Sequence, residues 1–381
     1  YSLRTLIMKL KFMISGGKVV KNENEIPFLI YSDDKRYWNV FKPICREFHK
    51  RRIEVVYMTS SKDDPVFNCE YDNVKAEYIG ETNKAFAKLN YVNASIFLST
   101  TPGLEVYQWK RSKNVKYYVH IPHMAHDITT YRMFGLDYYD AILLSADYQE
   151  NDIRALEKMR NLPTKELYKV GIPYMDEMVE RFAQAKDIER VGKTVLLAPT
   201  WGPSGIFARY EGKIIDALLK TDYHIIIRPH PQSFISEKEM MNRLMKKYPG
   251  SAQLEWNQDN DNFGVLQRSD VLITDFSGVI FDFSLIFDKP IIYTNPQFDM
   301  DVYDAWWLKK PLWTLSALPR LGLELRDDNI DNIKELIDVC LTDDSYVQGR
   351  REVKAETWKH IGCGAVRTVD YLTKKYGEIE K

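Results

Sequence analysis

Short apolar runs bounded by polar residues alternate with stretches of helical periodicity along most of the chain. Such runs are typical of strands that are buried on both faces of a parallel sheet. In the first half of the chain they predict strands at Ile26–Tyr31, Ile53–Met58, Ala76–Ile79, Ser95–Leu98, Lys116–Val119 and Ala141–Leu144. Helical spacing predicts helices at Tyr37–Lys50, Asn83–Leu89 and Tyr174–Ala185. This alternation predicts an α/β fold with an open parallel sheet and helices on both faces.

A second series of the same kind begins after the polar stretch 186–193. It predicts strands at Val195–Ala198, His224–Ile227, Val271–Ile273 and Ile291–Tyr293. Helices are predicted at Glu211–Lys220, Glu237–Lys247 and Gly278–Phe287, followed by closing helices at Asn332–Leu341 and Val347–Lys374. The chain therefore contains two doubly wound units in succession.

Three predicted strands of the second series end in polar turn motifs. The motifs are Thr200-Trp201, Arg228-Pro229-His230-Pro231 and Asp275-Phe276-Ser277-Gly278. Because ligands of open α/β sheets bind beyond the carboxyl ends of the strands, we expect the three motifs to converge. Together they supply backbone N–H groups, hydroxyls, a guanidinium and an imidazole, which are the groups that bind a diphosphate.

Several of these residues also have a purely structural interpretation. Asp275 and Ser277 are favoured helix caps. Trp201 packs on a ligand or on its own loop. Asp282, on the following helix, is as readily a solvated or capping carboxylate as a ligand group.

The first series contributes one cluster of titratable side chains directly after a predicted strand. Three of the seven histidines, His120, His123 and His126, fall within eight residues, and Asp127 follows them. Histidine titrates near neutral pH and therefore suits proton transfer. Metal binding is the alternative, but a His-x-x-His-x-x-His-Asp stretch is not a standard zinc set.

Three stretches in the second series resemble the CDP-glycerol glycerophosphotransferase family, whose members build teichoic-acid-type and capsule polymers. They read LLAPTW from Leu196, IIIRPHP from Ile225 and TDFSG from Thr274, the last followed by FDFSLIFDKPIIY. The resemblance is good from Lys193 to Asn295 and looser before that. It places a catalytic histidine in the region of the histidine cluster, usually within a WHGT-type motif that a lysine follows. This sequence lacks both features; His123, after Pro122, is the best positional match, with His120 and His126 as rivals.

The resemblance implies a transferase of the EC 2.7.8 type. It would move a phosphoalditol, glycerol phosphate above all, from a CDP-activated donor to a hydroxyl of a lipid-linked saccharide or cell-surface polymer, and release CMP. His123 and His230 are the expected catalytic residues. The expected nucleotide and diphosphate ligands are Thr200, Trp201, Arg228, His230, Asp275, Ser277 and Gly278. No residue is assigned to a metal and no cofactor is certain, although Mg²⁺ is compatible with this chemistry.

Two other functions fit the same pattern. One is a glycosyltransferase of the same architecture that uses a nucleotide sugar, since fold alone does not decide function. The other is a non-catalytic polymer-binding domain, which the absent HGT motif keeps open. Release of CMP or UDP from a panel of activated donors separates these alternatives.

The resemblance also implies the GT-B architecture, in which two Rossmann-like domains face each other across a cleft. We expect a basic segment at 1–22, an acceptor domain at 23–185 and a nucleotide-binding domain at 186–345. In this architecture the final helix commonly crosses back to the first domain, which predicts that role for residues 346–381.

Composition narrows the setting of the protein. The net charge of −1 excludes an overall attraction to nucleic acid. The four cysteines show no Cys-x-x-Cys spacing and indicate reduced, cytosolic thiols. No apolar run approaches the length of a transmembrane helix.

The first stretch, 1–22, is basic and contains no acidic residue. Its interleaved apolar residues predict an amphipathic helix, which lies either on an anionic membrane surface or on the first domain. The first alternative predicts a cytoplasmic protein that is peripheral on the inner face of the plasma membrane. The chain begins at Tyr1 and is therefore compatible with being part of a larger protein.

Overall fold

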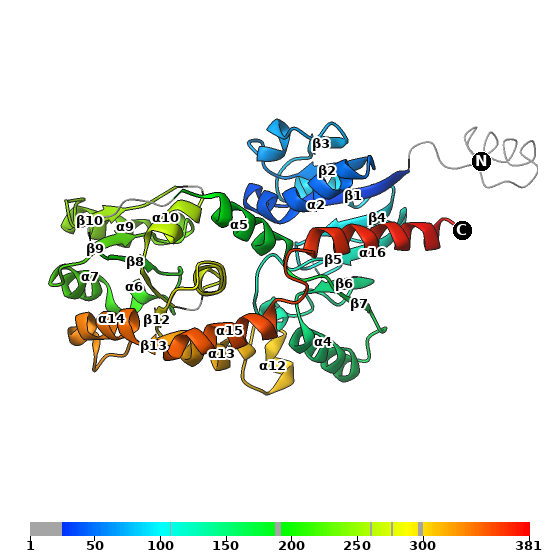
Figure 1. The fold of residues 1–381 in the computed structure, drawn as a ribbon. Coiled ribbons are helices and arrows are strands. Elements are labelled where there is room, and N and C mark those ends of the chain that lie inside the picture. The colour runs from blue at the N-terminus through cyan, green and yellow to red at the C-terminus, as the bar shows by residue number, and fades with distance from the viewer. Residues whose placement is uncertain (1–24, 107, 187–191, 260, 276, 296–299) are drawn as a thin grey trace, which may run out of the picture.

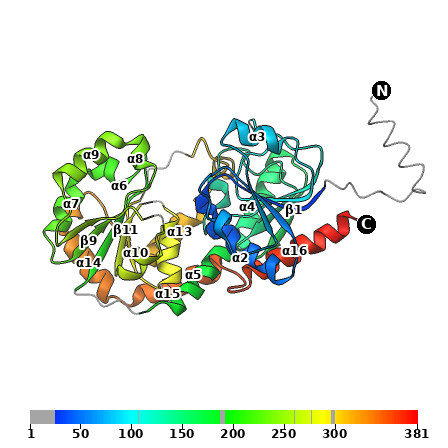
Figure 2. The same cartoon turned by 90° about the horizontal axis from the view of Figure 1, so that it is seen from above.

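Two parallel sheets lie side by side in the computed structural model, which describes residues 25–106, 108–186, 192–259, 261–275, 277–295 and 300–381 (Figures 1 and 2). The strands of the first sheet are β1 (Ile26–Ser32), β2 (Val55–Thr59), β3 (Val74–Tyr78), β4 (Ala94–Ser99), β5 (Val115–His120), β6 (Ala141–Leu144) and β7 (Glu166–Lys169). Those of the second are β8 (Thr194–Ala198), β9 (His224–Ile227), β10 (Leu254–Trp256), β11 (Val271–Thr274), β12 (Ile291–Tyr293) and β13 (Gly322–Glu324). The predicted α/β class is confirmed. We refer to the first sheet with the elements packed on it as the first half, and to the second sheet with its elements as the second half.

The strand order is β3-β2-β1-β4-β5-β6-β7 in the first sheet and β10-β9-β8-β11-β12-β13 in the second. The order reverses between β1 and β4 and again between β8 and β11. Connections on the two sides of such a point run to opposite faces of the sheet, which leaves a crevice at the carboxyl ends of the strands. Each half therefore has one crevice in which a ligand can bind.

Helices cover both faces of each sheet. Those beside the first sheet are α2 (Trp38–Lys50), α3 (Asn83–Leu89), α4 (Asp147–Arg160), α5 (Pro173–Gln184) and α16 (Gly364–Ile379). Those of the second half are α6 (Ile206–Tyr210), α7 (Gly212–Leu219), α8 (Ser233–Ser236), α9 (Lys238–Lys247), α10 (Phe263–Arg268), α11 (Val279–Phe281), α13 (Trp313–Leu321), α14 (Ile333–Thr342) and α15 (Ser345–Thr357). Helix α12 (Ala305–Leu308), between β12 and β13 in the sequence, packs on α4 of the first half. Short 3₁₀ turns are η1 (Lys35–Tyr37), η2 (Pro65–Asn68), η3 (Ile128–Thr130) and η5 (Ile330–Asn332), and η4 (Asp282–Ile286) is a π-helix.

The apolar runs arise because successive residues of each central strand pack on opposite faces. In β8, Val195 and Leu197 join the core on one face of the sheet, and Leu196 joins the core on the other. In β1, Ile30 and Leu29 divide in the same way between the two cores of the first sheet. Strands covered on both faces need apolar residues at every position, which explains why the sequence located them well.

The helix predicted at Gly278–Phe287 has a different form. Residues 279–281 make a short α-helical turn, and η4 continues it as a π-helix. The single helix predicted at Val347–Lys374 is also wrong, because α15 and α16 are separated by residues 358–363. In this break the Asp176 carboxylate accepts the backbone N–H groups of Gly362 and Gly364 at 2.7 and 2.9 Å. Gly362, within the break, has a φ of +78°, a conformation that favours glycine.

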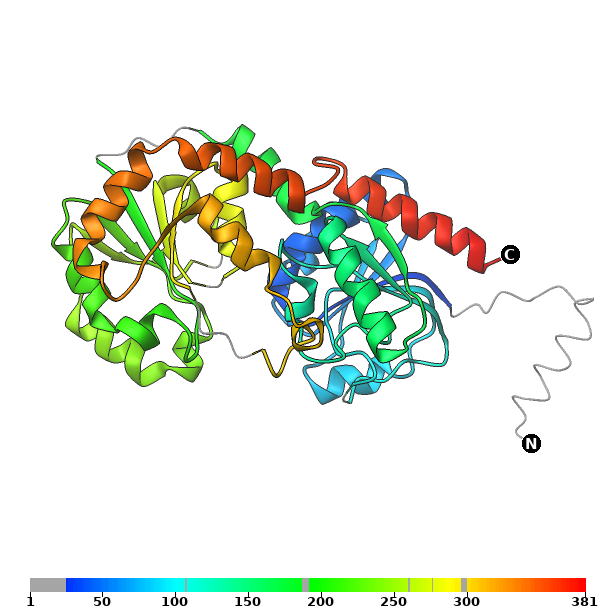
Figure 3. The same cartoon turned by 90° about the horizontal axis from the view of Figure 1, so that it is seen from below.

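Helix α16 packs against α2 and β4 of the first half, although α15 lies beside the second sheet (Figure 3). Val369 and Leu372 of α16 share an apolar core with Phe28 and Phe48 of the first half. The chain thus returns to the first sheet at its end. The domain limits at 185/186 and 345/346 remain a prediction.

None of the described helices is both long enough and apolar enough to cross a bilayer. The predicted amphipathic helix at 1–22 lies outside the described residues.

Candidate active site

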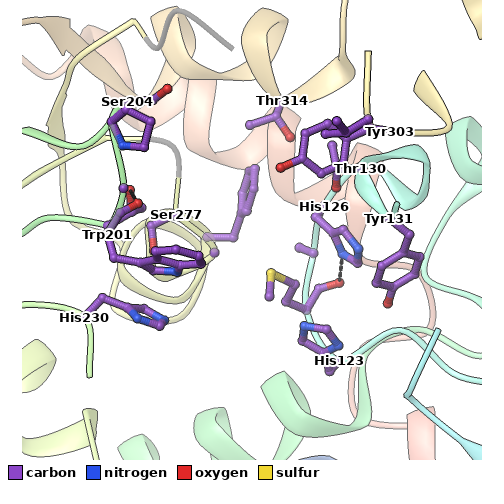
Figure 4. Close-up of a pocket in the computed structure, with 18 residues that line it drawn as sticks. His123, His126, Thr130, Tyr131, Trp201, Ser204, His230, Ser277, Tyr303 and Thr314 are labelled. Carbon is purple, nitrogen blue, oxygen red and sulfur yellow. Dashed lines mark hydrogen bonds between the residues drawn. The ribbon is translucent and has the colours of Figure 1, made fainter. Parts of the chain in front are cut away.

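The carboxyl ends of the two sheets meet at a cleft with two adjoining hollows, of about 550 Å³ and about 510 Å³. Both hollows are lined by His123 and Met124 from the first half and by His230, Ser277 and Gly278 from the second. Figure 4 shows His123 and His126 on one wall, with Trp201, Ser277 and His230 facing them. The strand-end motifs of both halves therefore converge on one site.

His123 stands at the junction of the two hollows, three residues beyond the end of β5. Its Nδ1 atom lies 3.1 Å from Oγ1 of Thr100, which follows β4, and its ring lies 4.9 Å from that of Tyr37. Burial lowers the pKa of His123, and the nearby His126 and Arg36 lower it further. The imidazole is therefore neutral at pH 7. If Nδ1 carries the proton and donates it to Thr100, Nε2 is an unprotonated base.

His126 and His120 are placed less favourably for contact with a substrate. His126 donates from Nδ1 to the Met124 carbonyl oxygen at 3.0 Å and lines the larger hollow only. His120 has an exposed fraction of 0%, lines neither hollow, and its Nε2 lies 3.3 Å from the Tyr131 hydroxyl. Of the three histidines, His123 and His126 can thus reach a bound molecule.

Asp127 has a structural role that also joins the two halves. It is buried, and its carboxylate accepts the backbone N–H groups of Trp313 and Thr314 at 2.7 and 2.9 Å and the Thr314 hydroxyl at 2.6 Å. These groups belong to the first turn of α13, so Asp127 satisfies N–H donors that the helix leaves unpaired. It positions the histidine loop against the second half and does not line either hollow.

We expect Asp127→Ala to lower the free energy of unfolding by about 1–3 kcal/mol, because it leaves buried donors of α13 unpaired. Urea denaturation measures this loss. Asp147→Ala is the matched control, because the carboxylate of Asp147 is 63% exposed and pairs with Lys169 at the surface. That variant should lose less than about 1 kcal/mol. Equal losses in the two variants would contradict the assignment.

His230 and Ser277 are presented by the second half, opposite His123. The His230 Nδ1 atom accepts the backbone N–H of Gln232 at 3.1 Å, which leaves the proton of the neutral ring on Nε2. His230 is therefore a hydrogen-bond donor in the cleft. Ser277 lines both hollows and adds a hydroxyl.

Gly278 allows the two halves to approach closely. A Cβ atom at this position would lie 2.5 Å from Sδ of Met124 in the histidine loop. A side chain here would force the Met124 side chain to move, whether or not the Gly278 N–H also binds phosphate.

Arg228 and Asp282 line the smaller hollow but are already engaged within the protein. The Arg228 guanidinium donates to the Asn257 side chain and to the Asp259 carbonyl oxygen. Asp282 accepts the Tyr174 hydroxyl at 2.7 Å, and burial raises the pKa of its carboxyl to about 6. Arg228 can still attract a phosphate by its charge, whereas Asp282 is held as part of the wall.

Asp275 shapes the loop that carries Thr200 and Trp201. Its exposed fraction is 1%, and its carboxylate accepts the backbone N–H groups of Thr200 and Ile206 at 2.9 Å each. It lines neither hollow, whereas Thr200 and Trp201 line the larger one. Asp275 therefore positions the loop, and the 49% exposed Trp201 ring is available to a ligand.

Among the residues that the structure describes, no group of three or more His, Cys, Asp or Glu side chains could hold a metal ion. His120, His123, His126 and Asp127 each contact a different group of the protein.

The structure adds cleft residues that the sequence analysis did not single out. They are Arg36, Tyr37, Thr100, Met124 and Tyr131. Arg36, Tyr37 and Thr100 follow predicted strands of the first half within a few residues. We looked for ligand-binding residues after the strands of the second half; the same search after the strands of the first half points to these three residues.

Comparisons with known proteins identify the family and the fold. The chain is 24% identical over 245 residues to the teichoic acid glycerol-phosphate primase of Bacillus subtilis (strain 168), and the match covers 60% of each chain. It thus spans less than two thirds of that relative. Among solved structures, the wall teichoic acid polymerase TagF superimposes with a TM-score of 0.59 at 15% identity, covering 98% of both chains. A UDP-GlcNAc 2-epimerase of Methanocaldococcus jannaschii, in complex with UDP-GlcNAc and UDP, gives 0.60 at 13% identity, covering 92% of this chain and 100% of the other.

At these identities the structural similarity establishes the fold alone, which is the predicted GT-B architecture. The family is established separately, by the match of residues 11–309 to the model of CDP-glycerol:poly(glycerophosphate) glycerophosphotransferases. That range includes the histidine loop and all three strand-end motifs of the second half. The chain belongs to the CDP-glycerol:poly(glycerophosphate) glycerophosphotransferase family.

Proposed function

We propose that the protein transfers glycerol phosphate from CDP-glycerol to a hydroxyl of a lipid-linked saccharide or a cell-surface polymer and releases CMP. The single observation that carries this proposal is the convergence of His123, His230 and Ser277 from opposite walls of one cleft. A neutral histidine on one side and hydrogen-bond donors on the other suit attack on a phosphorus atom between them.

In the proposed reaction the acceptor hydroxyl oxygen attacks the β-phosphorus of the donor. The bond from that phosphorus to the bridging oxygen breaks, and CMP leaves with the oxygen. His123 Nε2 takes the hydroxyl proton. His230 and Ser277 donate hydrogen bonds to the phosphate oxygens and stabilise the charge that develops on the transferring group.

The two halves take different parts in this scheme. Residues 186–345 would hold the nucleotide and the diphosphate, with Thr200 and Trp201 on the nucleotide side of the larger hollow. Residues 23–185 would bind the acceptor and supply the base. An in-line displacement requires this division, because the attacking and leaving oxygens lie on opposite sides of the phosphorus.

The test is to incubate the protein with CDP-glycerol, other CDP-alditols and UDP-sugars, with an acceptor, and to measure which nucleotide is released. CMP from CDP-glycerol supports the proposal. UDP from a sugar nucleotide would favour the glycosyltransferase alternative. Binding without any nucleotide release would favour a polymer-binding domain.

The basic segment 1–22 would bring the protein to the inner face of the plasma membrane, where a lipid-linked acceptor lies. We expect the full chain to co-sediment with anionic vesicles more strongly than a variant that lacks residues 1–22, because basic side chains are attracted to anionic lipids. Zwitterionic vesicles are the control. Equal sedimentation of the two folded forms with anionic vesicles would refute this role.

A further inference from the structure

Arg36 is a cation of the first half that faces the cleft. It lies on η1, a few residues beyond the carboxyl end of β1 and beside the point where the strand order of the first sheet reverses. It lines the smaller hollow together with His123, His230 and Ser277. This is the crevice of the first sheet, where open α/β sheets bind ligands.

Asp34 holds the Arg36 side chain in one orientation. The Asp34 carboxylate accepts Nε of Arg36 at 2.8 Å, Nη2 at 3.2 Å and the backbone N–H of Arg36 at 2.9 Å. Nη1 makes no hydrogen bond to any described residue. A guanidinium that is fixed along one edge loses little further freedom when the remaining N–H groups bind an anion.

The two hollows contain few positive charges. Among the described residues that line them, Arg36 and Arg228 are the only lysine or arginine side chains. Both Nη atoms of Arg228 are already hydrogen bonded within the second half. Arg228 keeps further N–H groups, but its guanidinium is oriented toward Asn257 and Asp259. Nη1 of Arg36 has no such partner among the described residues, so it is available to the transferring phosphoryl group, whose negative charge lies on two non-bridging oxygens.

The charge of Arg36 acts on both predicted catalytic histidines. After burial, it is one of the causes that lower the pKa of His123, and it is the largest charge effect that lowers the pKa of His230. Arg36 thus pairs with Asp34 and also lines a hollow with residues of both halves, which a purely local ion pair does not require. Arg36 thus lies near the space between the proposed base and the proposed donor.

We propose that Arg36 binds the phosphoryl group that is transferred and stabilises its charge in the transition state, from the acceptor side of the cleft. This inference rests on the proposed function. As the acceptor oxygen joins the β-phosphorus and the bridging oxygen leaves with CMP, the glycerol ester bond stays intact and negative charge develops on the two non-bridging phosphoryl oxygens. A guanidinium there completes the shell of donors that the second half provides.

The kinetic test compares Arg36→Gln with Lys35→Gln. Lys35 is the matched control, because it carries the same charge on the same turn, pairs with Asp63 at the surface and lines neither hollow. We expect Arg36→Gln to lower kcat by about 100–1,000-fold, as removal of a donor to a developing oxyanion does. The Kd for CDP-glycerol, from calorimetry, should change little, and Lys35→Gln should behave as wild type. Arg36→Lys should lose less than Arg36→Gln.

Unchanged kcat in Arg36→Gln would overturn the proposal. So would a loss confined to the Kd of the donor, or one confined to the KM of a phosphate-bearing acceptor, since the arginine would then bind a different phosphate. If Lys35→Gln lowered kcat by the same factor, the effect would come from the loss of any positive charge near the cleft and not from Arg36 in particular, which would also overturn the proposal.

A second readout does not require activity. NMR titration of the histidine ring signals, with His230→Gln to assign its signal, should show a higher pKa of His230 in Arg36→Gln than in wild type. The sign follows because a removed positive charge favours the protonated ring. Lys35→Gln should leave this pKa unchanged. An unchanged value in Arg36→Gln would sink the inference even if glycerol phosphate transfer is established. A raised value without any transferase activity would instead locate the failure in the proposed function.

Discussion

His123→Ala is expected to reduce glycerol phosphate transfer by about 100–10,000-fold, the usual contribution of a general base. The reason is geometric: in the proposed mechanism the second half holds the donor, so the base that activates the acceptor lies on the first half. His123 lies at the junction of both hollows, is neutral at pH 7 and is oriented by Thr100. The affinity for CDP-glycerol, measured by calorimetry, should remain close to that of wild type.

His126→Ala is the control for this variant, because His126 lines the same wall and differs in its hydrogen bonding. It should retain most of the transfer activity. His123→Gln keeps the size and polarity of the side chain and should be as inactive as His123→Ala. If His126→Ala is the inactive variant, the base is His126. Wild-type transfer by a folded His123→Ala protein would contradict the mechanism.

His230→Ala is expected to raise the activation free energy of transfer by roughly 2–4 kcal/mol, by analogy with donors to an oxyanion. Its Nδ1 atom is occupied by the Gln232 N–H, so Nε2–H is the group that remains for the donor phosphates. Loss of this bond should appear in kcat more than in KM, because the interaction strengthens as charge develops. Steady-state kinetics with CDP-glycerol measure both.

His224→Ala is a matched control for this histidine. His224 is the first residue of β9, whereas His230 follows the last residue of the same strand. His224 therefore lies at the amino end of the strand and lines neither hollow. Normal kinetics are expected of it. A His230→Ala protein with an unchanged kcat would remove His230 from the catalytic residues.

The sequence located the buried strands because their residues are apolar on both faces. It missed β7, β10 and β13, which are short strands at or beside a sheet edge and carry exposed or half-exposed polar residues, such as Glu166 and Glu255. The helices α4, α6, α8, α10, α12 and α13 were also missed. Helix α4 is strongly polar, and α12 and α13 depend on contacts with the first half that no local pattern reveals.

Strand ends predicted where the site lies, but not what each side chain does there. Asp275 and Asp127 stand in motifs that suggest chemistry, and the fold uses both to hold backbone N–H groups. His120 ends β5, where the strand is buried on both faces, and its ring packs against Tyr131 and Tyr139. Arg36 also follows the end of a strand, β1, which makes it a candidate by the same argument, but the sequence alone does not show that its turn faces the second half.

The connection between β12 and β13 crosses to the first half, so the protein does not divide cleanly into two fragments. Residues 302–314 leave the second sheet and contact the first half, where Asp304 pairs with the buried Arg160 and Asp127 caps α13. Helix α16 then returns to cover the first core. Each half is thus completed by residues that are distant in the sequence: α16 covers the first core, and Asp127 caps α13 of the second half. A cut near residue 185 would give fragments with open cores and an uncapped helix, and such fragments would fold only by complementing each other.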